Sequence, residues 1–201
     1  MYKVIGFPKT RAFRVIWMLE ELGEAYEINP VAPRSDEARK FNPSGKVPVL
    51  VDGEDMISDS VAICQYLADK HGELTYAAGT IARAKQDSWT QFVVDDLEST
   101  LWFNAKNTFI LPERLRSDTA KAACKYDFDR TMKVLEARLG SQTYVMGDDF
   151  TVPDVVLGHC ASWAEDGAKW NLPDGAVKDY ADRVRARPAH ARAIAARDRF
   201  G

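Results

Sequence analysis

The sequence predicts a small α/β domain with a mixed sheet, followed by an all-helical domain. Three observations support this prediction. The chain has 201 residues, which is enough for two small domains with buried cores. Strand and helix patterns alternate over residues 1–74, whereas residues 81–201 show helical patterns only. Residues 75–80 are therefore expected to form the linker between the domains.

The first domain opens with a strand, a helix and a second strand. Residues 2–7 are strand-like, and the next apolar residues recur at helical spacing: Val15, Ile16, Leu19 and Leu22. Gly23 is a suitable C-terminal stop for that helix. Residues 26–28 then predict a weak strand, and residues 35–41 predict a short polar helix.

A hairpin and a further helix complete the first domain. Residues 47–51 are an apolar run, the Asp-Gly pair at 52–53 is a hairpin signal, and residues 56–57 begin the returning strand. Helical spacing resumes over residues 61–67. In this β-α-β-α-β-β-α order the opening implies parallel pairing and the hairpin implies antiparallel pairing. The order is the thioredoxin-like topology.

The second domain is predicted to be helical throughout. Residues 81–104 can form one long helix. A later apolar stripe consists of Phe128, Met132, Leu135 and Leu139. Asp118 before this stripe and Gly140 after it are the expected caps. Residues 179–199 predict a last helix that is interrupted at Pro188.

The segment Phe-Thr-Val-Pro-Asp at residues 150–154 predicts another helix start. If Thr151 is the N-cap, Asp154 stands at the third helical position, where its carboxylate can accept a bond from the N–H of the cap. Phe150 can also pack against Val155 as a hydrophobic staple. The segment therefore predicts a capping box.

Composition excludes several classes of protein. Hydrophobic residues make up 46% of the chain and charged residues 28%, as in ordinary globular proteins. The formal net charge of −3 indicates neither a nucleic-acid nor a membrane surface, and no apolar run approaches a membrane span. The apolar start is too short for a signal peptide. Cys64, Cys124 and Cys160 lie too far apart for a metal site or a disulfide framework, so we expect a reduced, cytoplasmic protein without a metal.

Pro48 stands at the mouth of the third predicted strand, although proline cannot donate to a ladder. A proline at this position is a hallmark of the thioredoxin-like topology, and we expect the Val47-Pro48 bond to be cis. That bond would turn the N–H and C=O of Val47 outward, so that an extended peptide could pair with it like another strand. A trans proline in a tight loop is the alternative.

Four segments resemble the glutathione transferase superfamily, especially its bacterial and theta-like members. They are residues 8–23 (beginning PKTRAFRVIW), 42–48 (NPSGKVP), 57–67 (beginning ISDSVAI) and 150–163 (beginning FTVPD). They occur in the family's order and at its spacing, and the resemblance runs over nearly the whole chain. Each segment also falls on the domain where the family has it.

This resemblance implies a glutathione site in the first domain. The backbone of Val47, beside Pro48, would pair with the cysteinyl unit. Ser60 would bind the γ-glutamyl carboxylate and Asp59 the ammonium group, because free N–H groups and the dipole at a helix start favour an anion. Lys46 would pair with the glycyl carboxylate. The alternative for Asp59 and Ser60 is a plain helix cap.

The thiol of glutathione needs an activator, because a free cysteine has a pKa of about 8.5 and the thiolate is the nucleophile. In the family that it resembles, a Tyr, Ser or Cys after the first strand donates this bond, and Thr10 falls on the serine of the theta-like pattern. Thr10 is therefore the candidate catalytic residue, since its hydroxyl can donate the same bond. The alternative is that Thr10 only caps the following helix. No cysteine lies at this turn, which excludes dithiol chemistry of the thioredoxin kind.

Few other residues are expected to take part in binding or catalysis. Phe103, Lys106 and Asn107 on the long helix could line a pocket for an electrophile, although an apolar helix face is more often core. Arg14 is expected to make a structural ion pair. The three histidines lack metal or triad spacing, and the arginines near the C-terminus indicate a solvated helix face rather than a nucleic-acid surface.

The chain is therefore interpreted as a cytoplasmic two-domain glutathione transferase. It would conjugate the glutathione thiolate to a hydrophobic electrophile, with no metal, nucleic-acid or membrane partner. The resemblance also implies a twofold homodimer. Two alternatives stay open: a glutathione-dependent disulfide reductase on the same fold, and a homologue that binds glutathione or a partner without turnover.

Overall fold

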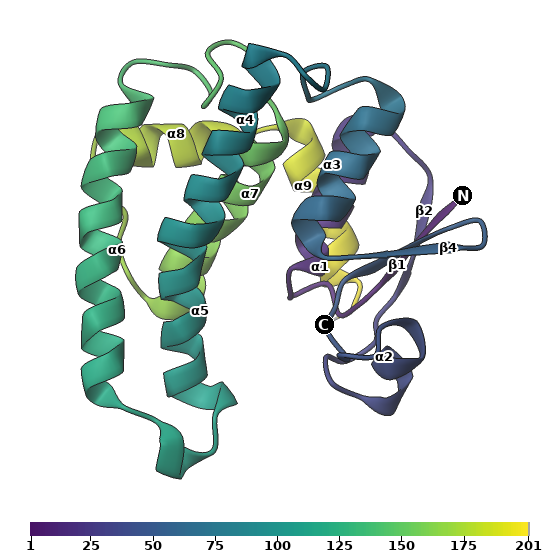
Figure 1. Ribbon diagram of the computed structural model, residues 1–201, viewed down its shortest axis with the longest axis horizontal. Coiled ribbons are helices and arrows are strands. Elements are labelled where there is room, and N and C mark those ends of the chain that lie inside the picture. Colours follow the sequence, from purple (N-terminus) through teal and green to yellow (C-terminus); the bar gives the residue numbers. More distant parts are fainter. Residues whose placement is uncertain (201) are drawn as a thin grey trace. The chain divides into compact units, whose positions relative to one another are not determined.

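The computed structural model describes residues 1–200 and confirms the predicted fold class (Figure 1). A thioredoxin-like unit with a four-stranded mixed sheet is followed along the chain by a helical unit. The first compact unit contains Met1–Ala78 together with the residues from Arg185 onward, and the second contains Gly79–Val184. The last helix therefore belongs to the first unit, whereas the sequence boundaries assigned all of residues 81–201 to the helical domain.

The sheet of the first unit has the strand order β2-β1-β3-β4. β1 (Tyr2–Ile5) pairs in parallel with β2 (Tyr26–Asn29), because the crossover helix α1 (Ala12–Leu22) returns the chain to the same end of the sheet. β3 (Val49–Asp52) pairs antiparallel with β1 and with β4 (Asp55–Ser58). The predicted hairpin and the predicted mixed sheet are both confirmed.

Helices pack on the two faces of this sheet. Ile5 and Val49 form a buried cluster with Ala38 of helix α2 (Asp36–Phe41). Neighbouring residues in a strand point to opposite faces, and on the other face α1 packs against α3 (Ser60–His71) (Figure 1). Helices therefore cover both faces of the central strands β1 and β3, which carry the buried apolar residues of the sheet.

The last helix, α9 (Pro188–Asp198), packs against α1. The carboxylate of Glu21 accepts bonds of 2.7 Å from Nε and Nη2 of Arg187, and one of 2.9 Å from Nε1 of Trp17. The ring centroid of His190 lies 4.6 Å from that of Trp17, and burial lowers the pKa of His190 below its ordinary value. Pro188 starts this helix, where a proline is tolerated because the first N–H groups have no intrahelical acceptor.

The second unit is built from helices. Its α-helices are α4 (Ile81–Phe92), α5 (Ser99–Ala105), α6 (Asp118–Leu139), α7 (Val152–Ser162) and α8 (Ala176–Arg185). Shorter π and 3-10 turns extend them: η1 (Val93–Glu98), η2 (Lys106–Ile110), η3 (Glu113–Leu115) and η4 (Trp163–Ala168). The first helical run therefore continues past residue 104 to Ile110. Within residues 79–184 the β pairing consists of two isolated bridges.

The caps of α6 differ slightly from the prediction. Ser117, not Asp118, is the N-cap, because its Oγ accepts a 3.2 Å bond from the N–H of Ala120. Asp118 is the first helical residue, where a carboxylate is still favoured by the helix dipole. Gly140 is the C-cap of α6 and Gly23 the C-cap of α1, as expected.

The capping box at the start of α7 is confirmed and is part of a larger buried network. The carboxylate of Asp154 accepts bonds from the N–H and the hydroxyl of Thr151, at 2.8 and 3.1 Å. It also accepts bonds from the N–H of Val145 at 3.0 Å and the hydroxyl of Tyr180 at 2.7 Å. Asp154 is fully buried, and this burial raises its pKa to about 6 although the four hydrogen bonds act in the opposite direction.

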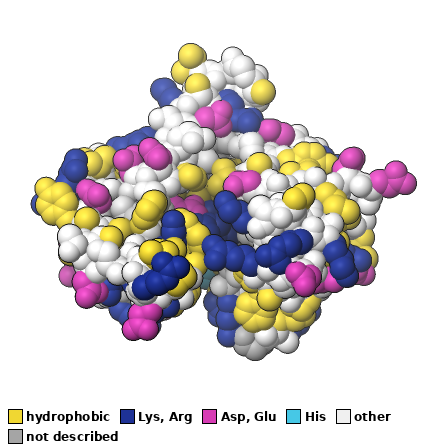
Figure 2. Space-filling view, turned by 60° about the horizontal axis from the view of Figure 1, so that its bottom comes forward, with side chains coloured by type: hydrophobic (Ala, Val, Ile, Leu, Met, Phe, Trp, Pro, Cys, Tyr) yellow, Lys and Arg dark blue, Asp and Glu magenta, His cyan; other side chains and the backbone are white. Residues whose placement is uncertain are grey.

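The surface carries charges of both signs, and Figure 2 shows Lys and Arg side chains interspersed with Asp and Glu. Among residues 1–200, every helix falls short of the length and apolar character that crossing a bilayer requires. The same residues contain no group of three or more His, Cys, Asp and Glu side chains arranged to hold a metal ion. All three cysteines are free.

Candidate functional site

Most of the residues that the sequence predicted to form a site lie at one end of the strands of the sheet. Val49 pairs with Ile5 on one side and with Ser58 on the other. The last residues of β1 and β4 and the first residue of β3 therefore lie side by side at the same end of the sheet. The topology consequently gathers residues 46–48, residues 59–60 and the loop before α1 within one part of the first unit.

Val47 lies in the loop that enters β3, and the Val47-Pro48 peptide bond is cis. A Cβ atom placed on Gly6 would lie 2.9 Å from the Cβ of Val47, so the glycine allows the end of β1 to approach this loop closely. Neither the N–H nor the C=O of Val47 has a hydrogen-bonding partner within residues 1–200. An extended peptide could use both groups as a further strand does.

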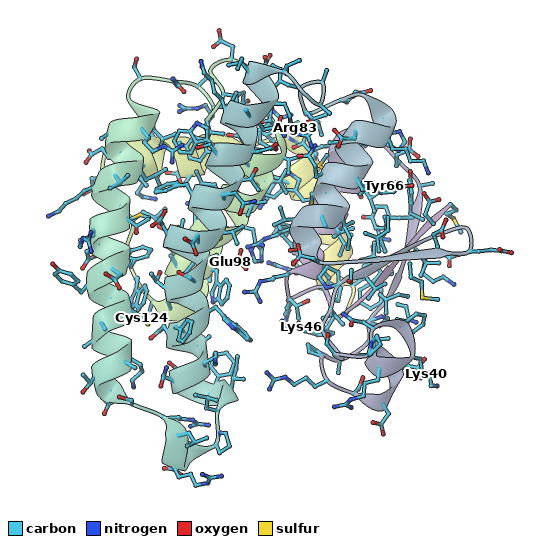
Figure 3. All side chains as sticks on the ribbon, viewed as in Figure 1. Lys40, Lys46, Tyr66, Arg83, Glu98 and Cys124 are labelled. Atoms are coloured by element: carbon cyan, nitrogen blue, oxygen red, sulfur yellow. The ribbon has the colours of Figure 1, made fainter. Side chains whose placement is uncertain are left out.

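Lys46 precedes Val47 in the same loop (Figure 3). The loop is held by two hydrogen bonds to its backbone: the N–H of Lys46 donates to Oγ of Ser44 at 3.2 Å, and its C=O accepts from Nδ2 of Asn42 at 3.1 Å. The residue is exposed, and its ammonium group forms no ion pair with any residue that the structure describes. The charge is therefore available to a small anion.

Asp59 caps α3 from a strained backbone conformation. Its φ of +76° lies in the left-handed region, which residues other than glycine rarely adopt. Its Oδ1 accepts bonds from the N–H groups of Val61 at 2.9 Å and Ala62 at 3.2 Å, so the helix-cap role is observed. Only one carboxylate oxygen is used, and the side chain is exposed. Capping therefore leaves the second oxygen for a cationic group.

Ser60 offers two donors at the start of the same helix. It is 3% exposed, and its Oγ accepts a 3.3 Å bond from Nη1 of Arg14. A guanidinium group only donates, so the proton of the Ser60 hydroxyl stays free for another acceptor. The N–H of Ser60 likewise has no partner within residues 1–200. Both donors stand at a helix N-terminus, where an anion is favoured.

Thr10 has its hydroxyl engaged within its own turn. Its Oγ1 donates a 2.7 Å bond to the C=O of Phe7 and accepts a 3.2 Å bond from the N–H of Ala12. A hydroxyl has one proton, so Thr10 can donate to a sulfur atom only after releasing Phe7. The bond from Ala12 ties the Thr10 hydroxyl to the start of α1, and donation to a thiolate requires a rotation of the hydroxyl.

The three pocket candidates of the second unit lie close together along one helical segment. Phe103 is 52% exposed, and Nζ of Lys106 lies 4.8 Å from the centroid of its ring. Asn107 is buried, with Nδ2 donating to the C=O of Phe103 at 2.9 Å and Oδ1 accepting from the N–H of Ser117 at 3.1 Å. Asn107 therefore joins η2 to the start of α6, whereas Phe103 is open to solvent on this unit.

Two further polar groups of the first unit are poor candidates for a thiol activator. Cys64 is fully buried, and burial raises the pKa of its thiol to about 12. Tyr2 begins β1, at the end of the sheet away from Val47, and its hydroxyl lies 2.9 Å from Nε2 of His71. Tyr2 therefore lies away from the candidate site.

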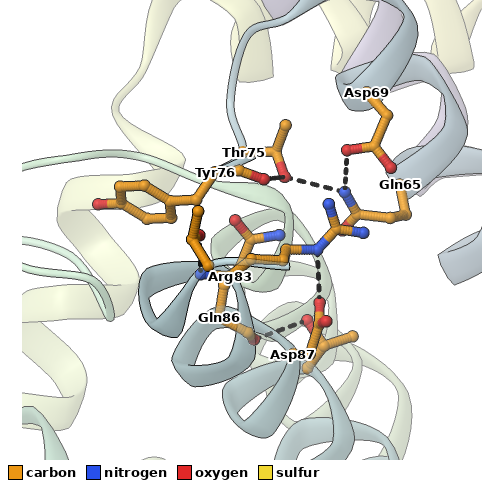
Figure 4. A network of polar contacts seen from close by, with 9 residues as sticks. Gln65, Asp69, Thr75, Tyr76, Arg83, Gln86 and Asp87 are labelled. Atoms are coloured by element: carbon orange, nitrogen blue, oxygen red, sulfur yellow. Dashed lines mark hydrogen bonds and ion pairs between the residues drawn. The ribbon is translucent and has the colours of Figure 1, made fainter. Parts of the chain in front are cut away.

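Other polar clusters have structural partners of their own. In the first unit, Nε2 of Gln65 donates to Asp69 at 3.0 Å and to Thr75 at 2.9 Å, which fixes the chain that leaves α3 (Figure 4). In the second unit, Nε of Arg83 donates to Asp87 one turn later on α4, at 2.9 Å. The first set joins α3 to the segment that follows it, and the second lies within α4.

A thioredoxin-like unit with a four-stranded mixed sheet, followed along the chain by a helical unit, defines the class of protein. Residues 10–70 match the model of the glutathione S-transferase N-terminal domain. Glutathione S-transferase 1 of Zea mays is 31% identical over 146 residues, which cover 68% of each chain. The crystal structure of the theta class glutathione S-transferase from Xanthomonas axonopodis pv. citri, with glutathione bound, is 25% identical and covers 96% of each chain with a TM-score of 0.81. This chain belongs to the glutathione S-transferase family.

This chain is also similar to proteins with a different name. Elongation factor 1-gamma 1 of Oryza sativa subsp. japonica is 27% identical over 140 residues, which cover 68% of this chain and 32% of that protein. Similarity to this chain is therefore not confined to proteins named glutathione S-transferase.

Proposed function

We propose that this protein is a glutathione transferase that joins the glutathione thiolate to a hydrophobic electrophile. One observation carries the proposal: at one end of the thioredoxin-like sheet, several hydrogen-bonding groups have no partner within residues 1–200. Because these groups have no partner in the protein, a ligand can pair with them, and a short peptide with charged ends would suit their chemistry.

Each unsatisfied group has a counterpart in glutathione. The N–H and C=O of Val47 would pair with the backbone of the cysteinyl unit. The hydroxyl and N–H of Ser60 would bind the γ-glutamyl carboxylate, and the free oxygen of Asp59 would bind the neighbouring ammonium group. Lys46 would face the glycyl carboxylate. The site would thus fix both ends of the ligand and place its sulfur near the loop before α1.

Catalysis would then rest on proximity and on stabilisation of the thiolate. We propose that the hydroxyl of Thr10 turns from Phe7 to the sulfur when the ligand is present, and that the start of α1 adds its dipole. The electrophile would be held by the helical unit, with Phe103 and Lys106 as the exposed candidates on its surface. Asn107 would support that surface from behind.

The binding step is tested by thermal unfolding with and without glutathione. A ligand that binds the native state raises the melting temperature by mass action. Ser60→Ala removes a bond to a charged group, which is worth about 1.5–3 kcal/mol, so affinity should fall roughly 10- to 100-fold. Ser141→Ala is the matched control, because Ser141 is exposed and lies in the other unit. An unchanged affinity in the Ser60 variant would reduce Ser60 to a helix residue.

The role of Thr10 is tested by the thiol pKa of bound glutathione, read from thiolate absorbance against pH. If Thr10 donates to sulfur, Thr10→Ala raises this pKa, by about one unit for each 1.4 kcal/mol of lost stabilisation. Thr10→Ser keeps the donor and should titrate like the parent. A cap role predicts instead that Thr10→Ala lowers stability by about 1 kcal/mol and leaves the thiol pKa unchanged.

A homologue that binds without turnover is the second candidate. It is favoured by the Thr10 hydroxyl, which is already bonded to Phe7. Conjugation rates with a panel of electrophiles distinguish the two, because tight glutathione binding with no turnover identifies the second. A disulfide reductase would instead reduce mixed disulfides of glutathione faster than it conjugates.

We further propose a cytoplasmic, twofold homodimer in which the first domain of one chain contacts the helical domain of the other. Three free cysteines accord with a reducing compartment. A stable isologous interface of this kind usually buries upward of about 1,200 Å² in total. Sedimentation analysis across the micromolar range tests it, and a monomer throughout would contradict it.

A further inference from the structure

Arg14 is the largest buried cation of the first unit, and the proposed site does not yet use it. It lies on α1 with none of its side chain exposed. Burying a guanidinium group is expensive unless its donors are satisfied by good partners. One of those partners is Ser60, whose Oγ accepts from Nη1 at 3.3 Å across 46 positions of sequence. A buried arginine therefore ends on the residue that begins α3.

This bond determines how the Ser60 hydroxyl can act. A lone serine hydroxyl rotates freely and can serve as donor or acceptor. Here the guanidinium group donates to one lone pair of the oxygen, so the hydroxyl does not use its own proton for Arg14 and can donate that proton to a second group. The N–H of Ser60 is unpaired within residues 1–200 as well. Arg14 thus leaves the hydroxyl proton of Ser60 available beside the N–H of the same residue, and two donors at one helix start suit a carboxylate.

The position of Arg14 is supported by a second residue of α3. Cys64 stands one turn beyond Ser60 and is also fully buried. Burial raises the pKa of its thiol, and the charge of Arg14 is felt there in the opposite direction. Helices α1 and α3 pack against each other, and the bond to Ser60 places the guanidinium group of Arg14 at the start of α3.

We propose that Arg14 is a positioning residue for glutathione, which holds the Ser60 hydroxyl as a donor toward the γ-glutamyl carboxylate. The inference rests on the proposed function, because it assigns that carboxylate to Ser60. It requires no contact between Arg14 and the ligand.

The test is a double-mutant cycle on glutathione affinity, measured by calorimetry with Arg14→Met, Ser60→Ala and the double variant. Arg14→Met should weaken binding roughly 10-fold in the parent and less than about 2-fold once Ser60 is alanine, because the residue acts through the hydroxyl. Equal effects in both backgrounds would overturn the proposal, as would an Arg14→Met protein that binds like the parent. Lys3→Met is the control, because it removes an exposed cation paired with Glu27 and should leave affinity unchanged.

A purely structural role is separated from positioning by the ligand. Cysteinylglycine lacks the γ-glutamyl carboxylate, so its weak binding should be the same in the parent and in Arg14→Met. If Arg14→Met weakens both ligands equally, the residue only maintains the fold. Arg14→Lys keeps the buried charge without the planar fork, and it gives the same comparison if the methionine variant does not fold. A parent that binds no glutathione overturns the proposed function, whereas a binding parent with an inert Arg14 overturns this inference alone.

Discussion

The buried carboxylate of Asp154 should make the protein less stable as the pH rises through the mildly acidic range. Burial raises its pKa to about 6, whereas the same group in the unfolded chain titrates near 3.8. Between these values the folded state holds a proton that the unfolded state releases. The stabilisation is therefore complete below the unfolded value and is lost as the pH rises through about 6. A shift of about two units corresponds to about 3 kcal/mol.

The assay is urea unfolding of the parent and of Asp154→Asn from pH 4 to pH 7. Asparagine cannot ionise, so it mimics the protonated acid at every pH. The parent should lose about 3 kcal/mol relative to the variant across this range. Exposed carboxylates whose pKa is lowered, such as Asp52, Asp118 and Asp198, act in the opposite direction but cancel in the difference. A parent that gains stability relative to the variant would refute the reasoning, because the four hydrogen bonds would then outweigh desolvation.

Three further predictions concern the first unit and the assembly. Gly6→Ala should cost on the order of 1–3 kcal/mol in urea unfolding, because φ is +144° and the new Cβ would lie 2.9 Å from that of Val47; parent-like stability would contradict this close approach. Arg187→Met should lower the free energy of unfolding by on the order of 3 kcal/mol. The side chain of Glu21 is only 6% exposed, and the substitution removes the bidentate partner of its carboxylate. Arg192 is 53% exposed and pairs with Glu20, so Arg192→Met should lower the free energy of unfolding by less than about 1 kcal/mol. Equal losses in the two variants would show that burial of the ion pair is not decisive. Sedimentation should show a dimer at micromolar concentration.

Local sequence signals predicted the elements of this fold well. The glycine caps of α1 and α6, the hairpin before α3 and the capping box of α7 each depend on residues a few positions apart, which periodicity and cap chemistry can detect. The cap of α6 was misplaced by one residue because Ser117 and Asp118 are both good N-caps, and geometry alone decides between them.

Contacts between distant residues could not be predicted in this way. The sequence predicted a last helix that is interrupted at Pro188. It could not predict the packing of α9 against α1, because that packing includes the bond between Arg187 and Glu21, 166 positions away. The bond between Arg14 and Ser60 likewise joins α1 to α3, and only the fold shows that the arginine is buried. The site residues at the strand ends were found through a family resemblance. Their open hydrogen-bonding groups became visible only with the backbone.

The packing of α9 on α1 has a consequence for how the chain is made. A ribosome releases Met1–Ala78 early, and domains of nascent proteins generally fold in order from the N-terminus. Here the first unit cannot be completed until the residues after Arg185 emerge, while Gly79–Val184 form a continuous unit that needs no later segment. The second unit can therefore finish before the first. Until α9 arrives, the side chain of Trp17 lacks the cover of His190, and the growing chain exposes apolar surface on α1 that the complete unit buries.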